Sequence, residues 1–522
     1  MDVKKNLNFV TKYIKGEFQS LLGVDISHTP TSRLALNQWI SKTDKTEIQG
    51  KELLITAFRN HTWIEWAAYA ACVFKNMGYN TTLLYRASEV SKFYSELPSF
   101  LNFWVGVKKI PGIKLVDVES AAFDQPTFDS FINMPDDYYS AAIAYDFHVE
   151  KEDILNNLAP EYETAKGALK LKTAQVTSVL KELWKENKYH RFILYSGIIS
   201  DSRGAMDISK ENTQEFVCVE GWSWRSGHVI YNYNAPALEY NVRGWMNSLG
   251  AWNDQKEKEI NSYIKFLDGE NVNEPGWLDN FYLVQRSKIN TEFSKELNDF
   301  IKGEEPIALL APNVIGDSSL LNRETIFSSL RAWIEAIITY FKNNPDKKLI
   351  VRAHPAEVWV AEYKLKIRIG ELALQLSKDI PNIFILDGRD KTNTFSLLPY
   401  SRVGLIWISS VGFDMVIRGL PVIAAADPKY SGLGIVEEPR TQQEYFELLE
   451  KFMSTQHRPS TNQIQKGKEF QYMVFKGFSF QAQGTTYRAD SCRLGNMPNQ
   501  EEHDRFYKIL VGEAPAPDLL ND

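Results

Sequence analysis

Short apolar runs alternate with longer amphipathic segments along much of the chain, and most runs end in polar or glycine-containing residues. Residues 53–58 (Leu-Leu-Ile-Thr-Ala-Phe) predict a buried strand, and residues 62–77 predict a helix that ends at Gly78. Residues 81–85 supply the next strand. Two strands joined by a helix predict a parallel βαβ unit with a right-handed crossover, so the first half begins as an α/β domain.

The rest of the first half is less regular. Residues 91–188 predict mostly helix, although the pattern assigns neither state to 114–118 and 141–146. Two further strands are predicted, each followed by a polar loop: 191–195 with loop 196–204, and 215–219 with loop 220–222. Because parallel strands end at one edge of a sheet, we expect both loops to lie at the same edge as the loop at residues 59–61.

A second regular region follows a break at residues 302–306 (Lys-Gly-Glu-Glu-Pro), which has turn chemistry. Beyond the break, strands and helices alternate, which predicts a second doubly wound α/β domain. The predicted strands are 307–310, 348–353, 383–386, 403–408 and 421–424, and the predicted helices are 323–342, 358–377, 394–400, 411–418 and 442–453.

The length of 522 residues exceeds what a single core usually supports, which favours two domains. We predict an α/β fold with two Rossmann-like doubly wound domains facing a cleft. The predicted divisions are an N-terminal helical segment (1–50), a Rossmann-like domain with helical insertions (51–302), a second Rossmann-like domain (303–455) and a C-terminal helical tail (456–522). The sequence alone does not show whether this tail returns to the first domain.

Charge and cysteine usage exclude some classes of protein. A net charge of −7 argues against a generic nucleic-acid-binding protein, which needs a basic face to displace counterions from phosphates. Three widely spaced cysteines, Cys72, Cys218 and Cys492, show neither the spacing of a zinc site nor a disulfide framework. A reducing cytoplasm therefore fits best.

No segment predicts export or a membrane span. The start of the chain lacks the apolar stretch of a signal peptide, and the longest apolar run, residues 66–74, falls short of the roughly 20 residues that span a bilayer. Residues 7–21 have an amphipathic helical pattern with lysines nearby. We interpret this pattern as packing against the body, with peripheral contact at the inner face of a membrane as the alternative.

Two strand ends in the second half carry groups suited to an anion. Arg352 and His354 end one strand, and Pro355 favours an extended backbone at His354. Ser409 and Ser410 stand at a helix start, where free N–H groups and the helix dipole favour negative charge. Taken alone, each strand end also has a structural interpretation: His354 would hydrogen-bond to neighbouring backbone, and the serines would cap the helix. Because we expect the two strand ends to be adjacent, together they predict a phosphate site.

Other polar residues follow neighbouring strands of the same domain. Asn313 follows the first strand and would hydrogen-bond a sugar or cap the next helix. Lys429 and Tyr430 lie in the loop after the last strand. They would bind the ligand or would be ordinary surface-loop residues. For Asp414, one turn into the helix after Ser410, we favour a structural role.

The first domain offers three candidates for acid–base or covalent chemistry. His61 follows a buried strand immediately before a helix, where an imidazole of near-neutral pKa would deprotonate an acceptor hydroxyl. Asp201 and Glu220 are rival carboxylates in the two polar loops predicted at the same sheet edge. Only one of the three needs to be catalytic.

These motifs have a counterpart in a known family. Arg352-x-His354-Pro355, Ser-Ser-Val-Gly-Phe-Asp at 409–414, Gly-Leu-Pro-Val at 419–422 and Tyr-Ser-Gly-Leu-Gly at 430–434 resemble the bacterial capsule polysaccharide biosynthesis and export family. That family includes the transferases that add Kdo to capsule lipid linkers. The resemblance is clearest in the C-terminal part of the chain.

The resemblance implies a two-lobed GT-B fold and a nucleotide-activated sugar bound by the second domain, with the acceptor held by the first. By position, His354, Ser409 and Ser410 would hold the donor's phosphate, and Glu220 would lie in the cleft. Arg352, Asn313 and Tyr430, which end or follow strands of the second domain, are the further candidates for the donor site. The chain departs from the family where members more often have Glu-Ala and Lys-Pro, at residues 414–415 and 420–421.

We therefore predict a metal-independent glycosyltransferase that moves a sugar from a CMP- or UDP-sugar to a capsular or lipopolysaccharide-type glycan or glycolipid, in the cytoplasm and without an organic cofactor. Two alternatives remain open. The teichoic-acid glycerophosphotransferases share the strand-end His-Pro and a Ser-Ser-Val-x-Phe-Asp segment, which would make this a polyol-phosphate transferase using a CDP-polyol. The third possibility is a non-catalytic sugar-binding assembly protein of the same pathway.

Overall fold

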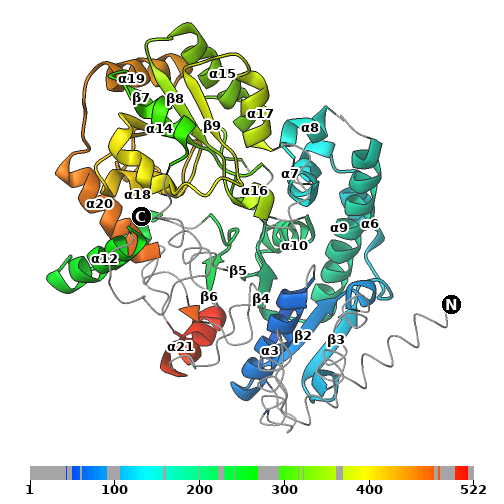
Figure 1. Cartoon of the computed structure of the whole chain (residues 1–522). Coiled ribbons are helices and arrows are strands. Elements are labelled where there is room, and N and C mark those ends of the chain that lie inside the picture. Colours follow the sequence, from blue (N-terminus) through cyan, green and yellow to red (C-terminus); the bar gives the residue numbers. More distant parts are fainter. Residues whose placement is uncertain are drawn as a thin grey trace, which may run out of the picture. The chain divides into compact units, whose positions relative to one another are not determined.

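The computed structural model of the chain describes residues 43, 50–58, 61–90, 106–147, 149–156, 160–198, 200–221, 228–239, 242–268, 293–315, 317–320, 322–359, 368–474, 480–481 and 500–514 (Figure 1). Contacts divide the chain into two compact units. Unit 1 contains residues 1–135, 167–240 and 478–518, and unit 2 contains residues 136–166, 241–477 and 519–522. The predicted N-terminal segment, including the amphipathic pattern at 7–21, lies almost entirely outside the described residues.

A mostly parallel sheet forms the centre of unit 1, and its described strands follow the order β12-β6-β5-β4-β1-β2-β3. The strands are β1 (Glu52–Ala57), β2 (Asn80–Tyr85), β3 (Ile113–Asp117), β4 (Tyr189–Tyr195), β5 (Phe216–Gly221), β6 (His228–Tyr233) and β12 (Phe480–Gln481). β1 to β5 pair in parallel, whereas β6 and β12 pair antiparallel. All of β1 except Glu52 is buried, as expected for a strand covered by helices on both faces.

Helices of unit 1 follow several of its strands, and α10 begins at Ser200, inside the segment 196–204 that was predicted as a loop. They include α3 (His61–Asn76), α6 (Gln125–Ile132), α10 (Ser200–Glu211), α21 (Gln500–Val511) and most of α9 (Pro160–Glu186). Local chemistry sets their ends: the Asp124 side chain accepts a hydrogen bond from the Thr127 N–H, and Pro126 lies in the first turn of α6.

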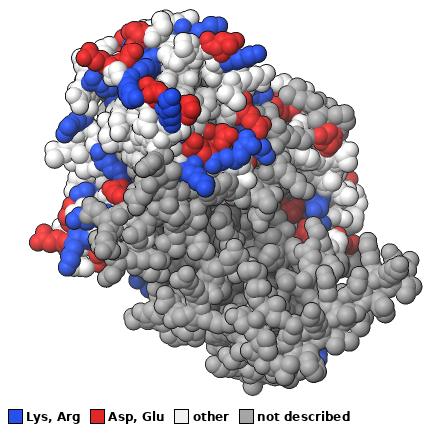
Figure 2. Space-filling view, viewed as in Figure 1, with Lys and Arg blue, Asp and Glu red and all other residues white. Residues whose placement is uncertain are grey.

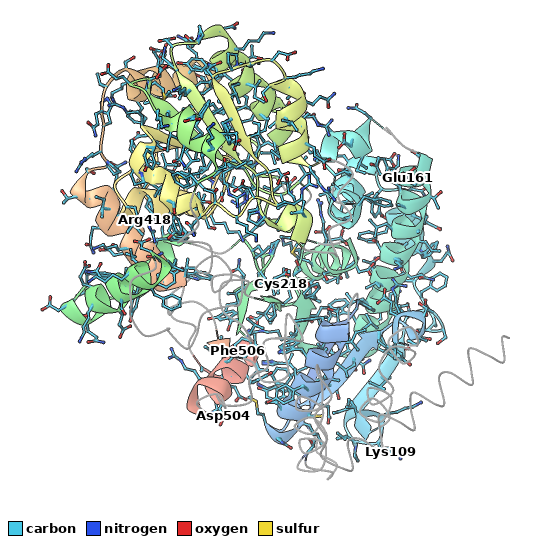
Figure 3. The ribbon with its side chains drawn as sticks, viewed as in Figure 1. Lys109, Glu161, Cys218, Arg418, Asp504 and Phe506 are labelled. Carbon is cyan, nitrogen blue, oxygen red and sulfur yellow. The ribbon has the colours of Figure 1, made fainter. Side chains whose placement is uncertain are left out.

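The C-terminal helix α21 packs into unit 1. Its last backbone carbonyls accept hydrogen bonds from the sheet: Tyr233 Oη donates to Ile509 O at 2.5 Å, and Arg191 Nη1 donates to Leu510 O at 3.2 Å. Phe506, labelled on this helix in Figure 3, is fully buried. The predicted helical tail therefore does return to the first half of the chain.

Unit 2 is built on a parallel sheet with the described strand order β11-β10-β7-β8-β9. The strands are β7 (Ile307–Ala311), β8 (Lys348–Arg352), β9 (Ile383–Leu386), β10 (Val403–Ile406) and β11 (Val422–Ala424). Large aromatic residues fill one side of the sheet. The rings of Trp333 and Trp407 lie 5.8 Å apart, and Trp333 Nε1 donates to Tyr445 Oη at 3.1 Å.

Helices of unit 2 come from both halves of the chain. They are α7 (Asp136–Phe147), α8 (Lys151–Leu155), α11 (Val242–Ser248), α12 (Asp254–Leu267), α14 (Lys295–Ile301), α15 (Leu330–Asn343), α16 (Ala356–Trp359), α17 (Ile369–Leu376), α18 (Val411–Ile417), α19 (Gln442–Ser454) and α20 (Thr461–Tyr472), with 3-10 turns η1 (Ser318–Leu320) and η2 (Thr394–Tyr400). No helix among the described residues combines the length and apolarity that crossing a membrane requires.

The predicted α/β fold with two doubly wound sheets is confirmed, and each predicted strand is present within two residues of its expected bounds. Residues 114–118, left unassigned by the pattern, are nearly all in β3, and residues 141–146 lie inside α7. One helix starts late: α15 begins at Leu330 rather than at residue 323, because the Ser329 side chain caps it by accepting from the Ala332 N–H.

The division into units differs from the predicted junction at residue 302. Unit 2 begins at residue 241 and also takes residues 136–166 from the first half. Charged contacts explain the difference, because Arg331 of α15 pairs with Glu150 at 3.3 Å and with Asp153 at 2.9 Å, which joins α8 to unit 2. Such tertiary pairs leave no signal in composition or periodicity.

Candidate functional site

The strand order of unit 2 creates a switch point between β7 and β10. The chain runs from β7 to β8 and β9 on one side, then returns to place β10 on the other side of β7. In open parallel sheets, ligands bind at the carboxyl edge at such a point. Asn313 follows β7, and its Oδ1 accepts a hydrogen bond from the Ile408 N–H after β10 at 3.1 Å. The two loops that border the switch point are therefore joined by one side-chain amide.

Ser409 and Ser410 lie on the β10 side of this point, directly before α18. Ser409 is 8% exposed, and the Val411 N–H lies 3.4 Å from its Oγ, a long contact. Ser410 is the N-cap residue of α18, but its side chain makes no capping hydrogen bond. The Ser410 hydroxyl thus does not have the capping role that a structural N-cap serine usually has.

Tyr430, in the loop after β11, supports this segment. Its Oη donates to the Ser409 carbonyl at 2.8 Å, and its ring packs against Phe413 and Phe470. The side chain is 1% exposed, and burial raises the pKa of Tyr430 well above its ordinary value. A Cβ at Gly412 would lie 2.4 Å from Tyr430 Oη, so only glycine permits this approach. The predicted ligand role of Tyr430 is untested, and its hydroxyl binds backbone.

His354 lies in the loop after β8. Its Nδ1 accepts a hydrogen bond from the Ala356 N–H at 3.1 Å, so the neutral imidazole carries its proton on Nε2. A hydrogen-bond donor suited to an anionic oxygen therefore stands at the carboxyl edge. The expectation of adjacent strand ends was wrong, however, because β7 separates β8 from β10. Two strand spacings amount to roughly 10 Å, which a phosphoryl group and its attached sugar can span but a single phosphate cannot.

Arg352 has a different environment from the one expected. Its guanidinium donates to the backbone carbonyls of Ala353, Asp387 and Asp390 at 3.0, 2.9 and 3.2 Å. The side chain is buried, and burial lowers the pKa of Arg352. These bonds tie the loop after β8 to the loop after β9, so the contacts of Arg352 position the His354 loop. Its predicted contact with the donor remains a prediction.

Asp414 has the surroundings of a structural residue. It is buried in α18, where Arg418 Nη1 and Gln471 Nε2 donate to Oδ1 at 3.2 and 2.9 Å. Burial raises the pKa of Asp414 to about 6. Arg418 is labelled in Figure 3, and its guanidinium carbon also lies 4.0 Å from the centre of the Phe395 ring.

Unit 1 has its own switch point, between β1 and β4. The loop after β1 leads to His61, whose backbone opens α3, while its side chain lies outside the described part of the chain. The loop after β4 begins with Ser196 and Gly197, both at positive φ (58° and 83°). A non-glycine residue in this region is uncommon, and such strain clusters at functional sites.

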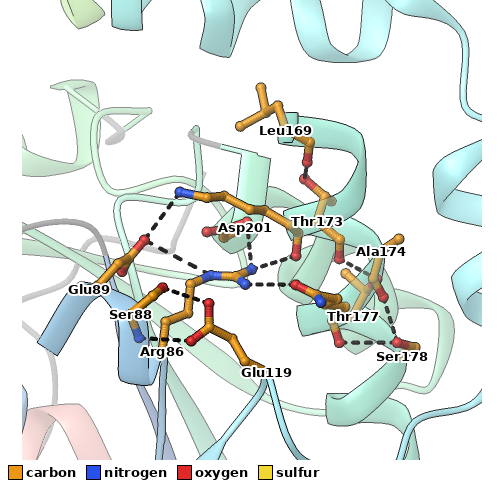
Figure 4. Close-up of polar contacts among 12 residues, drawn as sticks. Arg86, Ser88, Glu89, Glu119, Leu169, Thr173, Ala174, Thr177, Ser178 and Asp201 are labelled. Carbon is orange, nitrogen blue, oxygen red and sulfur yellow. Dashed lines mark hydrogen bonds and ion pairs between the residues drawn. The ribbon is translucent and has the colours of Figure 1, made fainter. Parts of the chain in front are cut away.

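Asp201 lies in the first turn of α10, beyond this loop, and faces a buried arginine (Figure 4). Its Oδ1 lies 3.7 Å from Nη2 of Arg86, which follows the end of β2. Arg86 also donates to Gln175 Oε1 at 2.9 Å and to the Lys172 carbonyl at 2.6 Å. Sequence reasoning missed Arg86, although a charged residue directly after a predicted strand end was a usable signal.

Glu220 is the penultimate residue of β5 and is 7% exposed. Tyr195 Oη, at the end of the adjacent strand β4, donates to Glu220 Oε1 at 3.1 Å. The Tyr195 ring in turn packs against Trp63, with centroids 4.6 Å apart. Glu220 and Asp201 therefore have different partners, a tyrosine hydroxyl and a guanidinium, which gives the two rival carboxylates different chemistry.

Neither a basic field on the visible face nor a metal-binding cluster is found among the described residues. On the visible face, Lys and Arg are interspersed with Asp and Glu over unit 2, without a field of one sign (Figure 2). Such a surface does not resemble the basic stripe of a nucleic-acid-binding protein. Within the described ranges, no group of three or more His, Cys, Asp and Glu side chains is placed to hold a metal ion.

Solved structures with a similar chain trace include two structures of KpsC from Thermosulfurimonas dismutans. The beta Kdo 2,7 transferase is 11% identical, with a TM-score of 0.34 over 60% of this chain and 86% of that one. The beta Kdo 2,4 transferase is 15% identical, with a TM-score of 0.29 over 54% and 79%. The alpha,alpha-trehalose 6-phosphate synthase of Burkholderia multivorans is 10% identical, with a TM-score of 0.33 over 82% and 96%. None of these scores carries a functional argument.

A comparison with curated proteins finds no match. The family model described as "Capsule polysaccharide biosynthesis protein" does match, over residues 276–462. This range contains the whole unit 2 sheet, and with it Asn313, His354, Ser409, Ser410 and Tyr430. The resemblance of the C-terminal part of the chain to the capsule polysaccharide biosynthesis family is therefore confirmed.

Proposed function

We propose that the protein is a glycosyltransferase that moves a sugar from a nucleotide-sugar donor to a surface glycan acceptor of the capsular or lipopolysaccharide type. The observation that carries the proposal is the switch point of unit 2, where the Asn313 amide, the Ser410 hydroxyl at the start of α18 and the His354 imidazole follow three strands of one sheet. This edge lies within the segment that matches the capsule family.

Unit 2 would hold the donor. The Ser410 hydroxyl, which makes no capping hydrogen bond, would donate to a phosphoryl oxygen, and these oxygens carry the negative charge of the nucleotide. The Nε2–H of His354 would donate to the far side of the same group or to the sugar. Donors of this kind stabilise charge on the leaving nucleotide more strongly as the bond to the sugar lengthens.

Unit 1 would hold the acceptor and the group that takes its proton. The acceptor hydroxyl attacks the anomeric carbon, the bond from that carbon to the phosphate oxygen breaks, and the nucleotide leaves with the bonding electrons. The hydroxyl proton passes to a base, for which His61, Asp201 and Glu220 are the candidates. The two units would then act as the two lobes of a GT-B enzyme.

Nucleotide release from activated sugars tests the proposal. The purified chain would be incubated with CMP-, UDP- and GDP-sugars, with and without capsular oligosaccharide, and free nucleotide would be measured. We expect one nucleotide class to be bound and released. If no activated sugar is bound or cleaved, the proposal is wrong, and if only CDP-glycerol or CDP-ribitol is consumed, the enzyme is a polyol-phosphate transferase.

A further inference from the structure

The phosphate site of unit 2 lacks the cation that the sequence assigned to it, because the Arg352 guanidinium donates to three backbone carbonyls. A phosphoryl group that accepts hydrogen bonds only from neutral donors is bound more weakly than one that also contacts a guanidinium, since charged hydrogen bonds are about twice as strong. A second arginine near the switch point would complete the site.

Arg243 is in a suitable place. It lies in α11, is exposed, and makes no hydrogen bond or ion pair with another residue of the described ranges. Its guanidinium lies against Gly432 with Nη2 nearest, because a Cβ built on that glycine would be 3.0 Å from Arg243 Nη2 and 3.8 Å from both Cζ and Nε. The three nearest atoms around that position all belong to this one guanidinium.

The loop that receives Arg243 belongs to the candidate site. Gly432 stands two residues after Tyr430, whose hydroxyl binds the Ser409 carbonyl at 2.8 Å. Glu438 holds the same loop, since its carboxylate accepts from the Gly432 N–H at 3.0 and 3.1 Å and from Ser431 Oγ at 2.7 Å. The same loop therefore contacts the Arg243 guanidinium at Gly432 and the segment that carries the two serines through Tyr430.

We infer that Arg243 binds the phosphoryl group of the donor nucleotide, as the cationic member of the unit 2 site. The inference rests on the proposed function and deepens it. The planar fork of a guanidinium matches two phosphoryl oxygens at once, which a lysine or a single hydroxyl does not. Gly432 is then required because any side chain at this position would displace the guanidinium.

Calorimetric titration with CMP, CDP and UDP, and with cytidine and uridine, tests the inference. For Arg243→Ala, we expect the nucleotides to bind roughly tenfold more weakly or worse, with nucleoside binding unchanged. Arg243→Lys restores only part of the loss. Arg440→Ala is the matched control, because Arg440 is also exposed and follows the same loop; it leaves every affinity unchanged.

A glycine pair gives an independent test. Gly432 and Gly434 have similar backbone angles (φ 74° and 68°), so alanine strains both equally. A Cβ at Gly434 has only Lys466 Nζ near it, at 3.9 Å, whereas one at Gly432 contacts Arg243. Gly432→Ala should therefore weaken nucleotide binding, and Gly434→Ala should not.

The outcomes distinguish failure of the proposed function from failure of the role inferred for Arg243. If the unaltered protein binds no nucleotide, the proposed function fails, and this inference fails with it. If it binds nucleotides and Arg243→Ala binds them equally well, the inference is overturned while the proposed function stands. Equal weakening of nucleoside and nucleotide would also overturn it, because a phosphate ligand acts on the nucleotide alone.

Discussion

The hydroxyl of Tyr430 donates a hydrogen bond to the main-chain carbonyl of Ser409 at 2.8 Å, across two loops that are 21 residues apart in sequence. The same carbonyl accepts from the Gly412 N–H at 3.1 Å, so it is shared between the loop after β11 and the first turn of α18. The start of α18, where we place the donor phosphate, is therefore held by a buried phenol as well as by its own helix.

Tyr430→Phe should lower the free energy of unfolding of unit 2 by about 1 kcal/mol, the usual net value of one hydrogen bond. Nucleotide binding should weaken as well, because the Ser409 segment loses its support. Urea unfolding and titration with nucleotide measure the two effects. Tyr400→Phe is the control, since Tyr400 is 46% exposed. Unchanged nucleotide affinity in Tyr430→Phe would argue against the positioning role.

His354→Ala should weaken nucleotide binding by roughly tenfold with little change in stability, because a charge-assisted hydrogen bond is lost from a partly exposed loop. Glutamine at this position keeps an N–H donor and should recover part of the affinity. His457→Ala serves as the control, because His457 contacts Thr455 beyond the end of α19. A large loss of stability in His354→Ala would instead indicate a structural histidine.

Glu357 makes the stability of unit 2 depend on pH. Burial raises the pKa of its carboxyl to about 7, although the N–H groups of Ile369 and Gly370 donate to it. The folded state therefore holds a proton that the unfolded state releases near pH 4.5. The stabilisation from this proton is present below that pH and is lost as the pH rises through about 7.

The Glu357 contribution should be on the order of 3 kcal/mol. Thermal unfolding between pH 4 and 8 measures it, and Glu357→Gln should flatten the profile because an amide does not titrate. Glu371→Gln is the matched control, since the Glu371 side chain is 58% exposed and lies in the neighbouring helix. An equally steep profile in Glu357→Gln would assign the effect to other groups, of which Glu150, with a pKa raised by burial to about 7, is the first to examine.

Substitution of Gly197, in the loop after β4, should lower the stability of unit 1. A Cβ there would lie 2.8 Å from Cys218 Sγ and 2.9 Å from the Pro236 Cα, whereas Gly78, with a similar φ, has nothing within 4 Å. Gly78→Ala should cost about 1 kcal/mol of stability from backbone strain alone, and Gly197→Ala about 2 kcal/mol more from the clash. Equal losses would show that the loop adjusts freely.

Chelation should leave nucleotide binding and sugar transfer unchanged. Carboxylates in the edge loops of unit 2 already have partners: Asp427 pairs with Arg323, Asp387 with Arg389, and Asp390 accepts from the Thr392 N–H. Activity measured with EDTA, and again with added Mg²⁺ or Mn²⁺, checks this expectation. Activity abolished by EDTA and restored by one ion would assign a metal to the donor.

Periodicity was sufficient to predict most strands of the two sheets, because those strands are short apolar runs between polar turns. It assigned no state to most of β3 and predicted neither β6 nor β12. It was not sufficient to predict strand order. The assumption that the strands of His354 and Ser409 are neighbours ignored that a doubly wound sheet returns to its first strand, which puts β7 between them. The switch point follows from that return, and it places Asn313 at the centre of the site.

The partners of individual side chains could not be predicted from the sequence either. Arg352 was expected to bind a phosphate because it is a cation at a strand end, but burial makes carbonyl partners obligatory for it. Arg243 was not singled out, because Gly432, which its guanidinium contacts, is 189 residues away in sequence. Long-range contacts between loops decide such roles, and they leave no local pattern.

Because α21 packs in unit 1, part of unit 1 can form only after a late segment of the chain has been translated. The carbonyls that accept from Tyr233 and Arg191 belong to Ile509 and Leu510, which lie 276 and 319 residues later in the sequence. Unit 1, whose first strand is translated early, thus obtains these contacts only after α21 has been translated, while unit 2 has all the described strands of its sheet by residue 424. During synthesis, the nascent first unit must present an open hydrophobic groove, which a chaperone or the ribosome surface would shield until α21 arrives.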